Sequence, residues 1–194
     1  GKDIRRIVMN KSYRNTIEIA SYANQLAGIT EVELFERHGK PVEEKEFPGL
    51  IEALERVVKE LKLEKQAVTE AEADRMKMAD METAGAEGQE EFSYETAAVI
   101  TRTADEAREA YYILQKKLEA EGFDTKERLS LLHRDSTNFK KGLTVTTFYM
   151  AKGLEFDAVF IPETEKYVTS LHKQALYIDA TRALHFLRLY EVQI

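Results

Sequence analysis

Three short polar stretches of this chain carry side chains of the kind that bind phosphate or a nucleotide. The first is Ser12-Tyr13-Arg14-Asn15, which follows an apolar run and precedes a helical pattern. The N-terminus of a helix attracts anions, and an arginine beside it offers a forked donor suited to phosphate. Arg14 could equally pair with a surface carboxylate while Asn15 caps the helix, so this stretch alone leaves both interpretations open.

The second stretch is the polar turn KGLE at residues 152–155, which interrupts two β-rich apolar runs. Gly153 lets a ligand or another chain approach the backbone closely, and Glu155 is an acceptor suited to ribose hydroxyls. Thr146 and Thr147, just before the turn, could hydrogen-bond a nucleic-acid phosphate. A solvated turn containing glycine explains the same residues equally well.

The third stretch, YIDATRA at residues 177–183, ends a helical pattern. Arg182 is expected in the last turn of that helix, where a cation is favoured by the helix dipole, with Asp179 three residues earlier as an ion-pair partner. The alternative is an arginine that reaches across a cleft toward a transferring phosphate.

The elements that must position these residues alternate between strand and helix, which predicts an α/β fold. We expect strands at 4–9, 32–35, 42–47, 96–101, 129–132, 143–148, 158–161 and 186–192, and helices at 15–27, 48–63, 104–121 and 170–184. Ligands in open α/β sheets gather beyond the carboxyl ends of the strands, so we expect all three polar stretches there.

One connection conflicts with a simple parallel order. Only eight residues, 149–156, separate two of the expected strands, whereas adjacent parallel strands usually need a dozen or more. Either this link holds one tight turn, or the two strands are not neighbours in the sheet.

Composition excludes several classes of protein. The 194 residues include no cysteine, and the four histidines show no metal-ligand spacing, so we expect neither disulfides nor a metal site. No apolar run is long enough for a membrane span and no signal peptide is evident, so we expect a cytoplasmic protein. Residues 64–95 hold ten acidic and three basic residues, and therefore account for the whole net charge of −7; we expect an exposed insertion there.

Taken together and in this order, the three stretches resemble motifs of superfamily 1 helicases of the UvrD/Rep type. SYRNTIEIASYANQL is similar to motif IV, TTFYMAKGLEFDAVFIP to motif V, and LYIDATRAL to motif VI. The motif V version is most like the HelD-like branch, whose members act on bacterial RNA polymerase.

This resemblance implies that residues 1–194 form the second, C-terminal motor domain: a RecA-like three-layer α/β sandwich with a mainly parallel sheet. In that family a first RecA-like domain holds ATP and Mg²⁺ through a P-loop, and the second domain closes over it. By motif position, Arg14 and Arg182 would contact the γ-phosphate, and Gly153, Glu155 and Tyr13 would line the nucleotide site. The motif also assigns nucleic-acid contacts to Thr146, Thr147 and Lys152.

Some positions depart from the family pattern. Tyr149 and Met150 replace the usual motif V histidine and its polar neighbour, Ser12 replaces an asparagine, and Asp179 enters a usually apolar part of motif VI. These changes weaken the prediction of DNA contact more than that of nucleotide contact.

The chain contains no G-x-x-x-x-G-K-[ST] sequence, so we expect it to supply only half of an ATP site. The leading prediction is therefore a domain of an ATP-dependent DNA helicase or translocase, an ATP hydrolase as a full-length protein and inactive as this fragment. The alternative is an interaction and ATP-switch module of a helicase-like factor that binds RNA polymerase. A basic, aromatic groove for a single strand would distinguish the two.

Overall fold

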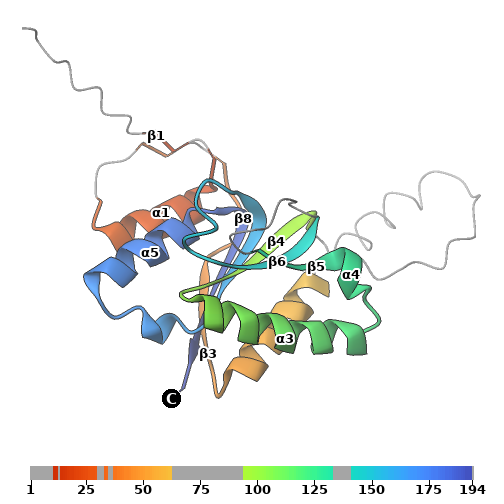
Figure 1. The fold of residues 1–194 in the computed structure, drawn as a ribbon. Helices are drawn as coiled ribbons and strands as arrows, with labels where there is room; N and C mark the ends of the chain where they lie inside the picture. The colour runs from red at the N-terminus through yellow and green to blue at the C-terminus, as the bar shows by residue number, and fades with distance from the viewer. Residues whose placement is uncertain are drawn as a thin grey trace, which may run out of the picture.

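The computed structural model describes residues 11–12, 14–29, 33–34, 37–62, 94–132 and 141–193. A six-stranded sheet, with strand order β3-β8-β7-β4-β6-β5, forms the centre, and every neighbouring pair in it is parallel (Figure 1). Its strands are β3 Glu43–Phe47, β4 Thr96–Thr101, β5 Leu129–Leu131, β6 Gly142–Thr147, β7 Phe156–Ile161 and β8 Ala183–Val192. A separate parallel pair joins β1 Lys11–Ser12 to β2 Glu33–Leu34.

Helices cover both faces of the sheet. They are α1 Ile17–Ala27, a helix over residues 50–62, α3 Ala104–Ala120, α4 Thr125–Arg128, the 3-10 helix η1 Thr164–Lys166 and α5 Ser170–Ala180. In Figure 1, α1 and α5 lie on one side, and α3 and the orange helix 50–62 on the other. The predicted three-layer α/β sandwich is therefore confirmed.

Alternation along β4 shows how the sequence specifies this sandwich. Ala97 and Val99 pack in one core with helix 50–62 and α3, whereas Ala98 and Ile100 pack in the other core with α1 and α5. All four side chains are fully buried. A strand buried on both faces reads as a continuous apolar run, which is why the strand boundaries were predictable.

The short link between β6 and β7 is explained by strand order. Since β4 lies between them, these two strands are not neighbours, and the second of the two alternatives is correct. The link runs from the end of β6 back to the start of β7, and Ala151 within it is buried in the core formed with α1 and α5.

Several predicted boundaries are wrong. The last helix, α5, ends at Ala180 rather than near residue 184, because residues from Ala183 onward pair with β7 instead. The first helix begins at Ile17 and has Thr16, not Asn15, at its N-cap. The strand expected at 4–9 and most of the acidic segment 64–95 lie outside the described residues.

Two helix ends show local capping. Thr103 caps α3 in a reciprocal capping box with Glu106. Gly28 adopts a left-handed conformation (φ 66°) immediately after α1, where glycine has no steric penalty.

Candidate functional site

The predicted site residues divide between two opposite edges of the sheet. Glu155 immediately precedes β7 and Arg182 immediately precedes β8, so both lie at the edge where these strands begin, here called the amino edge. Thr147 ends β6 at the opposite, carboxyl edge. Six residues of strand separate such edges by roughly 20 Å. The expectation that all three polar stretches lie at the carboxyl edge is therefore wrong.

The amino edge brings together two of the predicted nucleotide residues in an ion pair. Nη1 of Arg14 lies 2.5 Å from Oε1 of Glu155, 141 residues apart in the sequence. The Arg14 side chain is 72% exposed and that of Glu155 33% exposed. An exposed pair of this kind contributes little to stability, so it can open in favour of another ligand at small cost.

Arg182 lies beside this pair in the turn between α5 and β8, not in the last helical turn. Its guanidinium group donates to the backbone oxygens of Ile178 (Nε, 3.2 Å) and Leu154 (Nη1, 3.2 Å) and to Oγ1 of Thr181 (3.2 Å). Because Leu154 directly precedes Glu155, these bonds connect Arg182 to the polar turn of motif V. The side chain is half-buried.

The expected ion pair between Asp179 and Arg182 does not form. Asp179 is fully buried, and its Oδ2 accepts a hydrogen bond of 3.3 Å from the hydroxyl of Tyr167. Burial raises the pKa of the Asp179 carboxyl well above its usual value. The nearby charge of Arg182 acts in the opposite direction and lowers this pKa, but burial outweighs it.

Asn15 does not cap α1 as the sequence suggested. Its Nδ2 instead donates to the backbone oxygens of Thr181 (3.1 Å) and Ala183 (2.6 Å), across the sheet edge. Only 8% of Asn15 is exposed. Tyr13 lies outside the described residues.

Gly153 has a positive φ of 87° in the turn that precedes Glu155. An added Cβ would meet no atom within 4 Å, so the glycine is required by backbone conformation and not by crowding. The open space beside it is compatible with the close approach of a ligand. Lys152 is exposed on the same connection.

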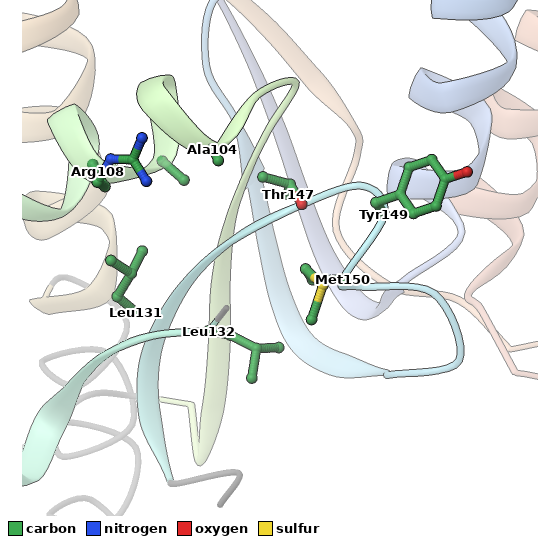
Figure 2. A pocket seen from close by; sticks show the side chains of 8 residues that line it. Ala104, Arg108, Leu131, Leu132, Thr147, Tyr149 and Met150 are labelled. Carbon is green, nitrogen blue, oxygen red and sulfur yellow. The ribbon is translucent and has the colours of Figure 1, made fainter. Parts of the chain in front are cut away.

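The carboxyl edge contains a pocket of about 250 Å³ (Figure 2). Side chains from α3, β5 and the end of β6 line it, among them Leu131, Thr147 and Met150. Tyr149 is 77% exposed at its rim, and in Figure 2 its ring projects away from the other labelled side chains. Thr146 is fully buried, and of the two threonines only Thr147 lines the pocket.

The described residues offer neither a metal site nor a membrane-spanning helix. No group of three or more histidine, aspartate or glutamate side chains suitable for a metal ion occurs among them. Within the same residues, no helix is long and apolar enough to cross a membrane.

Comparisons with known proteins agree with the fold. Residues 142–190, which include β6, β7, α5 and most of β8, match the family described as the UvrD-like helicase C-terminal domain. The chain shares its fold with the C-terminal domain of a possible DNA helicase from Lactobacillus plantarum WCFS1, at a TM-score of 0.60 and 22% identity over 93% of this chain and 88% of that chain. The family match supports the resemblance to superfamily 1 helicases over residues 142–190, and the structural match shows the same RecA-like fold, whereas the HelD-like branch stays a prediction.

A more distant structural similarity is to a viral helicase. The structure of arterivirus nonstructural protein 10, a helicase in complex with DNA, matches at a TM-score of 0.39 and 12% identity over 77% of this chain and 28% of that chain. A search of curated proteins found no match.

Two residues of the amino edge were missed by the sequence analysis. Asn15 was interpreted only as a helix cap, and Arg37 was not singled out. Arg37 donates to the backbone oxygen of Arg14 (3.2 Å) and contacts the ring of His185. No sequence signal identified these contacts, because the partners of Asn15 are more than 160 residues away.

Proposed function

We propose that this chain is the C-terminal motor domain of an ATP-dependent DNA helicase or translocase. The observation that carries the proposal is the meeting of Arg14, Glu155 and Arg182 at the amino edge. They come from three separate segments, each of which resembles a different helicase motif, and the fold brings them together.

The two arginines provide the chemistry that a nucleotide triphosphate needs from this side of a cleft. A guanidinium group presents a planar fork of donors that matches phosphate oxygens. The guanidinium group of Arg182 donates to neutral oxygens, which a phosphate can replace as acceptors. Arg14 is largely exposed and can exchange the carboxylate of Glu155 for a phosphate.

ATP and Mg²⁺ would be held mainly by a P-loop domain outside this chain. The chain itself has no P-loop sequence, and its described residues offer no acidic cluster for a cation. The residues at the amino edge fit the phosphates of ATP and not the metal. When bound, the nucleotide would supply the scissile phosphoanhydride bond, while Arg14 and Arg182 orient the phosphates and stabilise their charge.

The carboxyl edge supports a nucleic-acid partner. An exposed aromatic ring can stack on a base of any sequence, and Tyr149 offers one beside the Thr147 hydroxyl. Arg108 also lines this pocket, and its guanidinium group, paired with the exposed Asp105, could exchange that partner for a phosphate. This combination favours single-stranded DNA over the second candidate, an ATP-switch module that acts on RNA polymerase.

Hydrolysis of ATP by the full-length protein, with and without a single-stranded oligonucleotide, tests this function. Replacing Arg182 with alanine should lower turnover by about 10³-fold, as for other arginine fingers, and change the KM for ATP much less. Arg182→Lys should not restore the rate, because an ammonium group lacks the planar fork.

Arg128 provides a matched control, since it precedes β5, which lies three strands away from β7 in the sheet. Arg128→Ala should leave turnover unchanged. A folded Arg182→Ala protein with normal turnover would refute the proposed role. Stimulation of hydrolysis by RNA polymerase but not by the oligonucleotide would favour the second candidate.

A further inference from the structure

Three consecutive backbone carbonyl groups, at residues 181–183, accept hydrogen bonds from two other segments of the chain. Nδ2 of Asn15 donates to the oxygens of Thr181 and Ala183, which flank Arg182. The oxygen of Arg182 itself accepts a hydrogen bond of 3.0 Å from the backbone amide of Phe156. The peptide units on both sides of Arg182 are therefore fixed.

These donors are the sequence neighbours of the other two residues of the site. Asn15 follows Arg14 directly, and Phe156 follows Glu155 directly. A displacement of the Arg182 turn would therefore have to break bonds to the segments that carry the ion pair. This arrangement fixes the positions of all three side chains relative to one another.

Asparagine suits this position for a chemical reason. One amide nitrogen carries two hydrogens and can donate to two carbonyl oxygens at once. Aspartate would place an acceptor against two acceptors, and serine has a single hydrogen to donate. The bond to the Ala183 oxygen is buried and that to the Thr181 oxygen part-buried, so loss of the first would leave a buried carbonyl unsatisfied.

Arg37 is hydrogen-bonded to the segment that contains Asn15, residues 14–17. Its guanidinium group donates to the backbone oxygen of Arg14 (3.2 Å), and its own backbone oxygen accepts from the amide of Ile17 (2.9 Å). The segment from Arg14 to Ile17 is thus bonded at both ends by one residue, with Asn15 between them.

We propose that Asn15 is a positioning residue that fixes Arg182 relative to Arg14, and so sets the geometry in which the two guanidinium groups meet a nucleotide phosphate. This inference rests on the proposed function of the amino edge. Asn15 does not touch the nucleotide; it acts through the backbone of Arg182. A misplacement of about 1 Å in such a group can reduce turnover by about 10²-fold.

Asn15→Ala and Asn15→Ser in the full-length protein test this role. Asn15→Ala should lower kcat for ATP hydrolysis by about 10- to 100-fold and change the KM for ATP by less than about threefold, because substrate binding rests mainly on other groups. Asn15→Ser, which keeps one donor, should recover part of the rate. Asn24→Ala, on the same helix α1 and half-exposed, should behave as wild type.

A double-mutant cycle separates positioning from a general loss of structure. In an Arg182→Ala background, Asn15→Ala should cause little or no further loss of kcat, because its effect is transmitted through Arg182. Hydrogen exchange measured by mass spectrometry provides a readout that does not depend on activity. The peptide that contains residues 181–183 should exchange faster in Asn15→Ala than in Asn24→Ala.

The outcomes distinguish a failure of the positioning role of Asn15 from a failure of the proposed function. If Arg182→Ala leaves turnover unchanged, the proposed function fails. If Arg182→Ala abolishes turnover but folded Asn15→Ala or Asn15→Ser retains wild-type kcat, only the positioning role of Asn15 fails. An equal loss from Asn15→Ala in both backgrounds would also overturn it, since the residue would then not act through Arg182.

Discussion

The hydroxyl of Tyr167 donates a hydrogen bond of 3.3 Å to the carboxyl of Asp179, and both side chains are buried. Tyr167 follows the 3-10 helix η1, beyond the carboxyl end of β7, whereas Asp179 lies near the end of α5 that leads to the amino edge. The bond therefore joins segments that belong to opposite edges of the sheet. Oδ1 of Asp179 has no hydrogen-bond partner in the described part of the chain.

Asp179→Asn should increase stability more at pH 8 than at pH 4. Burial raises the pKa of the Asp179 carboxyl in the folded protein, so the folded state binds this proton more tightly than the unfolded state. Wild-type stability therefore falls as the pH rises above the ordinary aspartate pKa, whereas asparagine cannot ionise. Thermal unfolding at both pH values measures the difference.

Asp105 is the control for this prediction, because its side chain is 88% exposed. Asp105→Asn should shift the melting temperature little, and by a similar amount at both pH values. If Asp179→Asn gives the same shift at pH 4 and pH 8, the carboxyl is not held protonated in the folded protein.

Glu18→Gln should destabilise the protein at neutral pH. Oε2 of Glu18 accepts a hydrogen bond of 2.8 Å from the amide of Gly39, and Oε1 lies 3.0 Å from Nδ1 of His38. Partial burial raises the pKa of Glu18, but hydrogen bonds from the amides of Glu18 and Gly39 and from His38 outweigh it and lower the pKa to about 2. Losing these charge-assisted bonds should cost about 1–2 kcal/mol of unfolding free energy.

The same pKa gives the pH dependence of this loss. A carboxylate with a depressed pKa stabilises the folded state above its ordinary pKa, and the stabilisation is lost as the pH falls toward about 2. Urea unfolding of wild type and Glu18→Gln should thus differ fully at pH 7 and much less at pH 3. A difference that persists unchanged at pH 3 would contradict the role of the charge.

Local patterns in the sequence were sufficient to predict most strands of the sheet, but not their order. Strands such as β4 and β7 are buried on both faces and read as short apolar runs, and Thr103 and Gly122 mark the ends of α3. The edge of the sheet at which the polar residues lie was not predictable in the same way. The turn at Gly153 follows β6 in the sequence, but the link returns across β4 to the other edge.

Contacts between segments that lie far apart in the sequence could not be predicted from local patterns either. An asparagine before a helix is a good N-cap, so Asn15 was assigned a local role. Its actual partners follow α5, and they exist only because α1 and β8 are adjacent in the fold. Propensity describes the local alternatives, and tertiary hydrogen bonds decide between them.

Gly153→Ala and Gly122→Ala form a matched pair that separates stability from ligand binding. Both glycines have a positive φ (87° and 83°), and neither has an atom within 4 Å of an added Cβ. Each substitution should therefore cost about 1 kcal/mol of stability from backbone strain alone. Only Gly153→Ala should also raise the KM for ATP of the full-length protein, because only Gly153 borders the proposed nucleotide site. Equal KM values for the two variants would exclude such a role.

The isolated chain of 194 residues should not hydrolyse ATP. It contains the two arginines that would stabilise charge on the phosphates but no P-loop to bind the nucleotide. Phosphate release by the purified chain should equal that of its Arg182→Ala variant, which measures contaminating activity. Turnover that depends on Arg182 in the isolated chain would show that it contains a complete site.

Tyr149→Ala should weaken binding of the full-length protein to single-stranded oligo(dT) about 5- to 100-fold. The ring is 77% exposed at the rim of the carboxyl-edge pocket, and stacking of a base on an aromatic side chain contributes about 1–3 kcal/mol. Tyr149→Phe should bind nearly as tightly as wild type, because the stacking face remains.

Tyr112 on α3, 62% exposed, is the matched control, and Tyr112→Ala should leave affinity unchanged. Fluorescence anisotropy at fixed salt measures all four proteins, since phosphate contacts make affinity depend on salt. Equal affinities of wild type and Tyr149→Ala would mean that no base stacks on this ring, and would remove the main support for nucleic-acid binding at the carboxyl edge.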